Sequence, residues 1–189
     1  MPKQVDHEAR RQEIGAAVCR VMAARGLDAV SLRHVAAEAG VSMGRVQHYF
    51  ATKDEMLLFA FRLISERVAH RIGQVRGDTP QAFLRAVFLE LLPVSEAARA
   101  EAPVLAAFLA QAVVEPRLAE QLRAGGPELV AFVADRIRAV RPEGDADRDA
   151  MALLAFTDGL MLQMLIGQVD RDTAVDLLDH QLRSVLTTD

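Results

Sequence analysis

Arg45 and Gln47 are the residues of this 189-residue chain whose types and spacing best suit recognition of another molecule. An arginine guanidinium can bond at two points to guanine O6 and N7, and a glutamine amide can do the same with adenine N6 and N7. Met43 offers an apolar contact for a thymine methyl group, and Gly44 has no side chain to hold a duplex away. Each bidentate pair would discriminate between bases by about 1–3 kcal/mol. The alternative is that Arg45 and Gln47 are solvated surface residues.

Two short helices are expected to present these side chains. The segment 31–50 reads SLRHVAAEAGVSMGRVQHYF, in which Ser31 and Ser42 are good N-caps and Gly40 supplies the left-handed conformation that a tight turn needs. This pattern is typical of a helix-turn-helix, whose second helix lies in the DNA major groove, although an αα-hairpin without a ligand would look similar. The expected core between the helices consists of Val35, Val41 and Val46. The side chains expected to be exposed on the second helix are Ser42, Met43, Gly44, Arg45, Gln47 and His48.

The charge distribution is consistent with one nucleic-acid-binding end. The net charge is −4, but residues 1–53 hold 8 Lys and Arg against 5 Asp and Glu, whereas residues 54–189 hold 14 against 21. A small basic end on an acidic body suggests a module that meets polyanions and a body that does not. Ordinary variation of surface charge remains the alternative.

Composition predicts an all-α fold. Hydrophobic residues make up 51% and aromatic residues 5%, Trp is absent, and the strong helix formers Ala, Leu, Arg and Glu dominate. The single cysteine, Cys19, excludes a disulfide within one chain and a cysteine-based zinc site. The polar N-terminus lacks the apolar region of a secretory signal, and the uncharged run 102–114 is too short to span a bilayer. We therefore expect a soluble, cytoplasmic protein without a membrane, metal or cofactor partner.

About nine helices are expected from the hydrophobic spacing, the caps and the prolines. Thr52 and Glu55 should form a capping box at the start of the fourth helix. Pro93 and Pro116 should each end a helix, Pro103 is a possible kink, and 125–127 should interrupt the seventh helix. The expected helical ranges are 6–25, 31–40, 42–49, 52–72, 79–92, 95–114, 117–141, 147–168 and 172–186.

Residues 10–60 resemble the TetR family of transcriptional regulators. The resemblance rests on Arg11, Ile14 and Ala17, then on GLDAVSLRHVAAEAGVS, Gly44 and HYFATKDEML. It implies a three-helix DNA-binding domain over 1–52 and a helical ligand-binding and dimerisation domain over 53–189. It also implies a homodimer on a palindromic operator. Many family members carry an aromatic residue where this chain has Gln47, so the preferred DNA sequence does not transfer. The phosphate contacts that the resemblance implies are Ser31, Tyr49 and Lys53, with His48 beside them.

The last two expected helices could join two subunits. Residues 151–167 read MALLAFTDGLMLQMLIG and are apolar nearly all round, which predicts burial on more than one side. Two such helices from each subunit would form a four-helix bundle, and a monomeric core helix is the alternative. Two DNA-binding domains about 34–36 Å apart would then fit one turn of DNA. The residues expected at the subunit contact are Gly159, Val175, Leu178, Leu182 and Val185.

A ligand cavity is expected among the fourth to eighth helices, although most of its candidate residues would serve equally well as ordinary core. The candidate apolar walls are Phe59, Leu63, Phe83, Phe88, Phe108, Phe132, Met161 and Met164. The candidate polar groups are Gln111, Thr157, Asp158 and Gln163. A ligand pressing on Phe59 or Leu63 would tilt the fourth helix, which begins near Lys53 and ends near His70, and so release DNA.

The body weakly resembles the choline-responsive BetI branch of the family. The matching residues are AFLA at 107–110, Pro116, Leu118 and the DGL sequence at 158–160. Quaternary ammonium groups usually need an aromatic cage, but this chain has no Trp and its single tyrosine lies in the head. We therefore expect an apolar or amphipathic effector. An enzyme is disfavoured because the five histidines fall in separate segments, and a helical interaction protein without operator binding is the remaining alternative.

Overall fold

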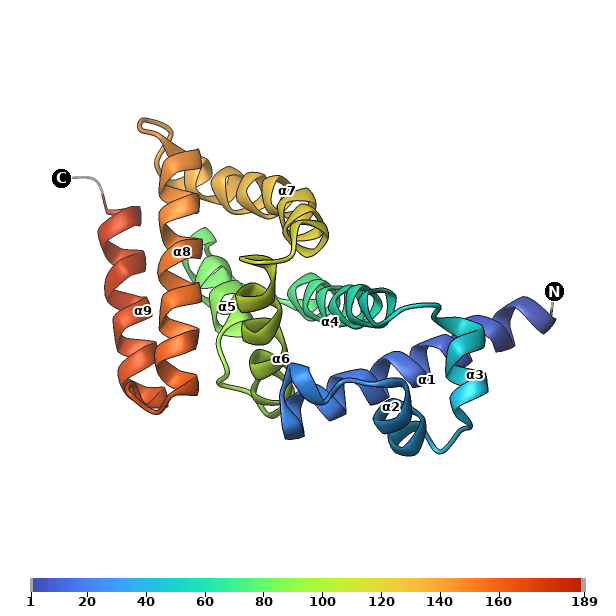
Figure 1. Cartoon of the computed structure of the whole chain (residues 1–189). Helices are drawn as coiled ribbons and strands as arrows, with labels where there is room; N and C mark the ends of the chain where they lie inside the picture. Colours follow the sequence, from blue (N-terminus) through green and yellow to red (C-terminus); the bar gives the residue numbers. More distant parts are fainter. Residues whose placement is uncertain (1, 188–189) are drawn as a thin grey trace. The chain divides into compact units, whose positions relative to one another are not determined.

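The computed structural model describes residues 2–187, with side chains from residue 7 onward, and that part of the chain is all-helical (Figure 1). A short 3₁₀ turn, Leu27–Ala29, separates the first two α-helices. The helices are α1 (Pro2–Arg25), α2 (Leu32–Ala39), α3 (Met43–Tyr49), α4 (Lys53–Gln74), α5 (Pro80–Leu91), α6 (Glu96–Ala112), α7 (Pro116–Val140), α8 (Ala146–Leu165) and α9 (Arg171–Leu186).

Two compact units make up the chain. The first contains the residues up to Arg67 together with Pro103–Leu118, and the second contains Val68–Ala102 with the residues from Ala119 onward. Packing therefore groups most of α4 and part of α6 with the N-terminal helices. The division at residues 52 and 53 remains a proposal about function, because α4 contributes residues to both units.

The first three helices form a small head around an apolar core. The α1 helix ends at Gly26, whose φ is 77°, and α2 ends at Gly40, whose φ is 65°. Only glycine adopts this left-handed region without strain, which explains the two sharp turns. Val35 and Val46 are fully buried, whereas Val41, at the turn, is half-buried. The core that holds α3 in place includes Ile14, Ala17, Val18, Val35, Val46 and Phe50.

Local capping starts α4. The Glu55 N–H donates to Thr52 Oγ1 at 3.1 Å, as a capping box requires. The Glu55 carboxylate, however, accepts from the Ala51 N–H at 2.7 Å instead of from the amide of Thr52. The reciprocal bond is therefore made one residue earlier than expected, and it still satisfies a free amide at the helix start.

The α6 and α7 helices correct two expectations drawn from proline and glycine. Pro116 does not end α6, which stops at Ala112, but occupies the first position of α7, where a missing N–H costs nothing. The expected interruption at 125–127 is wrong, because α7 continues through Pro127 to Val140. The second half of α7 buries Val133, Ala134 and Ile137 completely. That packing outweighs the local cost of the proline.

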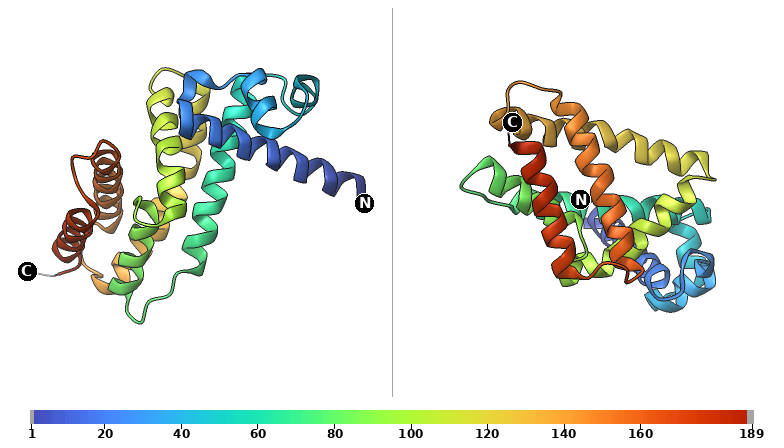
Figure 2. Two further views of the ribbon diagram at one scale, coloured as in Figure 1. Left: turned by 90° about the horizontal axis from the view of Figure 1, so that it is seen from below. Right: turned by 90° about the vertical axis from the view of Figure 1, so that its left-hand side faces the viewer.

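Helices α5, α8 and α9 pack together in the second unit. Figures 1 and 2 both show α8 and α9 running side by side. Phe88 of α5, Leu153 of α8 and Leu178 of α9 are fully buried. At the edge of this core, Arg85 of α5 donates from Nε and Nη2 to the Asp179 carboxylate of α9, at 2.6 and 3.1 Å. This bidentate pair fixes the position of α9 along α5.

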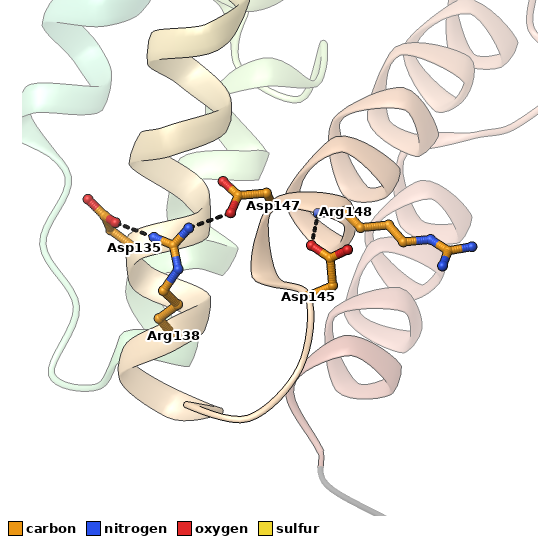
Figure 3. A network of polar contacts seen from close by, with 5 residues as sticks. All are labelled: Asp135, Arg138, Asp145, Asp147 and Arg148. Atoms are coloured by element: carbon orange, nitrogen blue, oxygen red, sulfur yellow. Dashed lines mark hydrogen bonds and ion pairs between the residues drawn. The ribbon is translucent and has the colours of Figure 1, made fainter.

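A chain of polar contacts shapes the turn between α7 and α8 (Figure 3). Arg138 contacts Asp135 and Asp147, each at 2.6 Å, so one guanidinium links the end of α7 to the start of α8. Asp145 caps α8 by accepting from the Arg148 N–H at 3.0 Å. Because these groups are exposed, they set the direction of the turn more than they stabilise the fold.

Within residues 2–187, no single helix is long and apolar enough to cross a membrane. The consecutive helices α6 and α7, which are separated by a sharp bend, reach the necessary length and hydropathy only when they are counted as one segment.

Candidate nucleic-acid interface

Most of the surface of α3 is open to solvent. Ser42, Met43, Gly44, Arg45, Gln47 and His48 are all exposed, and Met43 is 53% exposed despite its apolar side chain. Val46, in the middle of this run, is fully buried and anchors the helix to the head. The sequence therefore predicted correctly which side chains of α3 reach solvent. A base-reading helix needs this arrangement, because a buried anchor fixes the orientation of the exposed row.

Two serine caps hold the ends of the turn. The Ser31 hydroxyl accepts from the His34 N–H at 3.2 Å, and the Ser42 hydroxyl accepts from the Arg45 N–H at 3.2 Å. Each hydroxyl still has its own O–H to donate. His34 is held against the preceding turn, because its Nδ1 lies 2.7 Å from the Ala29 carbonyl oxygen. Both serines can therefore cap a helix and donate to a phosphate oxygen at once.

Gly44 has unoccupied space where a side chain would stand. A Cβ built at Gly44 would meet no atom of the protein within 4 Å. Its φ is also not in the positive range that favours glycine. Among the described glycines, those with a positive φ are Gly26, Gly40, Gly144 and Gly167. Neither packing nor backbone conformation within the chain therefore requires glycine at this position.

Three aromatic rings meet at the C-terminal end of α3. The ring centroids of His7 and Tyr49 lie 4.6 Å apart, those of His48 and Tyr49 5.1 Å, and those of His7 and His48 6.0 Å. His7 and His48 are exposed, and Tyr49 is half-buried. Sequence reasoning missed His7, because no local pattern relates α1 to the end of α3. Tyr49 is therefore partly packed, and the nearest ring of the cluster is that of His7.

The start of α4 combines Lys53 with a nearby carboxylate. Lys53 is exposed and has no ion pair within the described part of the chain. The Ala51 and Glu55 amides are already bonded to side chains, which leaves the amides of Lys53 and Asp54 at the helix terminus. The Glu55 carboxylate therefore occupies part of the positive helix end that a phosphate would use.

The ligand candidates of the first unit are largely packed inside it. Phe59 is 8% exposed, its ring lies 5.3 Å from that of Phe50, and Arg11 lies 4.7 Å above it. Phe108 is 1% exposed and contacts the Phe61 ring at 5.3 Å. Leu63 is also buried, and Gln111 is half-buried. A hollow of about 260 Å³ between α1 and α4 is lined by Phe59 and Leu63 together with Glu8, Arg11, Gln12, Arg62 and Glu66.

The aromatic and methionine candidates of the second unit have diverse surroundings. Half-buried Phe83 lies 6.1 Å from the Phe132 ring, with Arg136 over both rings. Phe88 is fully buried, Met161 is 4% exposed, and Met164 is half-buried. These side chains therefore differ both in exposure and in the groups that surround them.

The polar candidates of α8 also differ from one another. The buried Thr157 hydroxyl donates to the Leu153 carbonyl at 2.8 Å, so its own helix already satisfies it. Asp158 remains exposed, and desolvation around its carboxyl raises the pKa. The Gln163 Oε1 is buried without a hydrogen-bond partner among the described residues, so its capacity to accept a hydrogen bond is unused there.

The helix faces that were expected to join subunits are covered differently. Leu178, Leu182 and Val185 of α9 are 0%, 5% and 7% exposed in the single chain, so they pack against its own core, and Val175 is half-buried. Gly159 of α8 is exposed, with open space above it. The large apolar side chains that are exposed on α8 and α9, or directly after α8, are Met151, Leu162, Ile166 and Leu177.

Known proteins match both halves of the chain. Residues 14–59 match the family described as "Bacterial regulatory proteins, tetR family", and residues 80–187 match "BetI-type transcriptional repressor, C-terminal". The HTH-type transcriptional regulator PksA of Bacillus subtilis (strain 168) is 34% identical over 197 residues, covering 100% of this chain and 96% of PksA.

Solved structures agree with these matches. The crystal structure of a transcriptional regulator from Rhodococcus sp. Rha1 has a TM-score of 0.87 at 36% identity and covers 93% of this chain and 95% of that chain. The multidrug binding protein EbrR, crystallised with ethidium, has a TM-score of 0.72 at 27% identity. The match covers 95% of this chain and 99% of the EbrR chain. With a closed helix-turn-helix core, an exposed α3 face and these matches over both halves, the chain belongs to the TetR family of transcriptional regulators and carries a BetI-type repressor domain in its C-terminal half.

Proposed function

We propose that this regulator binds a palindromic operator as a homodimer and that a small apolar or amphipathic ligand releases it. The observation that carries the proposal is the set of exposed residues 42–45, 47 and 48 at α3, a helix that the buried Val46 holds in place. In this proposal Arg45 contacts guanine O6 and N7, Gln47 contacts adenine N6 and N7, and Met43 meets a thymine methyl group. Exposed side chains of α3 would thus supply three kinds of base contact.

Phosphate contacts would set the register of α3 in the groove. Ser31 can donate its hydroxyl from the start of α2, and Tyr49 and Lys53 can contact the backbone beyond the end of α3. The negative Glu55 carboxylate weakens the electrostatic attraction between the α4 N-terminus and a phosphate. The Lys53 ammonium would therefore provide most of the attraction at this contact. These contacts would add affinity to every DNA sequence and make binding depend on salt.

A second subunit would cover α8 in this proposal. Met151, Leu162 and Ile166 are 53%, 43% and 72% exposed, and with Ala155 and Gly159 they recur every three or four residues. That spacing places them on one face of the helix and its direct continuation. The open space above Gly159 would let a second helix approach closely. The contact would thus centre on α8, and the buried stripe of α9 would support it from behind.

The effector in this proposal is an organic molecule with a large apolar surface. Ethidium, bound by EbrR, is a ligand of a protein 27% identical to this one, and it supports an organic effector with a large apolar surface. Helix α4 contributes to both compact units, so a ligand that shifts α4 can alter how α3 meets DNA. Moving an equilibrium from 1:99 to 99:1 needs about 5.5 kcal/mol of differential binding, which apolar burial can supply.

Binding to the promoter of its own gene, followed by fluorescence anisotropy over a salt series, tests the proposal. Arg45→Ala should weaken specific binding by about 1–3 kcal/mol and relax preference at one base position. Lys53→Ala should weaken binding to all DNA sequences alike, and it should reduce the slope of log affinity against log salt concentration by about one. Arg123→Ala, at an exposed position of α7, is the matched control and should change neither. Equal effects of the three variants, or no promoter binding at all, would favour a helical interaction protein without an operator.

A further inference from the structure

We propose that His7 is a positioning residue of the DNA interface, which holds the Tyr49 ring so that the phenol hydroxyl meets a backbone phosphate. This inference rests on the proposed function of α3. It assigns a role in DNA binding to the first described side chain of α1, which lies far from the helix-turn-helix in the sequence. The observation behind it is the cluster of His7, His48 and Tyr49 rings.

His7 gives Tyr49 a ring contact from a second helix, in addition to the one within α3. His48 precedes Tyr49 directly on α3, and their rings meet edge to face at 81° with centroids 5.1 Å apart. His7 approaches from α1, and its ring lies at 48° to the Tyr49 ring with a centroid distance of 4.6 Å, the shortest in the cluster. Rings from two helices therefore restrict the Tyr49 side chain at the point where α3 ends.

The Tyr49 hydroxyl is available for a partner outside the chain. Tyr49 is half-buried, its ring packs against two histidine rings, and its hydroxyl forms no hydrogen bond with another described residue. A flexible phenol would lose conformational freedom on binding DNA, and that loss would weaken the contact. A ring that is already packed against His7 avoids much of that loss. His7 would thus act through Tyr49 and without a phosphate contact of its own.

A double-mutant cycle separates positioning from direct contact. Operator affinity is measured by anisotropy for the full chain, His7→Ala, Tyr49→Phe and the double variant. Loss of a hydrogen bond to a charged group predicts about tenfold weaker binding for Tyr49→Phe. If His7 acts through the hydroxyl, His7→Ala should cost about fivefold to tenfold alone and almost nothing in the Tyr49→Phe background. Additive losses in the double variant would overturn the proposal.

Two further readouts distinguish this role from a structural one. His7→Phe keeps an aromatic ring but no ring N–H, so it should restore affinity to within about twofold of the parent, whereas a direct phosphate contact would be lost. The salt slope should stay unchanged in His7→Ala, because no charge at a phosphate is removed. A reduced salt slope, or no rescue by phenylalanine, would contradict the positioning role.

His180→Ala, at an exposed position of α9, is the matched control and should bind as the parent does. Thermal unfolding of each variant reports whether the head stays folded. If the parent protein binds no operator, the proposed function fails. If it binds but His7 and Tyr49 are not coupled, only the present inference fails.

Discussion

At the scale of single residues, Gly44 is a position where the fold does not require glycine but the proposed contact with DNA does. Glycine inside a helix costs up to about 1 kcal/mol relative to alanine. Nothing in the chain offsets that cost at Gly44, since a Cβ there would meet no atom within 4 Å. The position lies between Met43 and Arg45 on the exposed face of α3. In the proposed complex, close approach of α3 to the duplex would account for a glycine that folding does not require.

Gly44→Ala should therefore raise stability and lower operator affinity together. We expect up to about 1 kcal/mol more stability in urea unfolding, because alanine is the better helix former. Operator binding should weaken by about tenfold or more, since the added methyl group holds α3 away from the groove. Gly125→Ala in α7, where a Cβ also meets open space, is the matched control. It should stabilise the chain and leave DNA binding unchanged. Unchanged affinity for Gly44→Ala would show that α3 does not approach DNA at this point.

At the scale of helices, α1 and α4 meet through a glycine that packing does require. A Cβ at the buried Gly15 would lie 2.6 Å from both Cδ1 and Cε1 of Phe59. The Phe59 ring has little freedom to move away, because Phe50 and Arg11 also pack against it. The fit between α1 and α4 therefore depends on the missing side chain of Gly15.

Gly15→Ala should destabilise the chain although alanine favours the helix. Overpacking costs about 1–3 kcal/mol, and the gain in helix propensity returns about 1 kcal/mol at most. The net loss should thus reach up to about 2 kcal/mol in urea unfolding. Gly125→Ala again serves as the comparison, because there the same substitution meets no neighbour. Equal stabilisation by both substitutions would mean that α1 and α4 do not pack as described.

The helices also show how much of the structure the sequence could predict. The caps at Ser31, Gly40 and Ser42 were predicted correctly because a cap bond joins residues only a few positions apart. The continuity of α7 through Pro127 was not, because it depends on packing between distant segments. The His7 ring was missed for the same reason, since its partners lie on another helix. Local signals thus predicted the head and the exposed row, and non-local contacts determined the rest.

At the scale of the whole molecule, two apolar stripes that look alike in the sequence have different surroundings. The α9 stripe with Leu178 and Leu182 is already buried in the single chain. The α8 stripe with Met151, Leu162 and Ile166 is exposed. Periodicity shows which side of a helix is apolar, but it does not show what covers that side. The expected subunit contact at Leu182 is therefore revised toward Leu162.

Leu162→Glu should yield folded monomers of 20.7 kDa in light scattering, because it places a charge in the proposed subunit contact. Operator affinity should fall by more than about a hundredfold, since each head would then bind without the other. Leu182→Glu should instead unfold the chain, because that side chain is only 5% exposed. Val113→Glu is the matched control: Val113 is an exposed apolar residue, at 84%, in the other compact unit, and its replacement should leave the dimer intact. A Leu162→Glu variant that stays dimeric and binds the operator normally would place the subunit contact on another face, whereas monomers with full operator affinity would remove the need for two heads altogether.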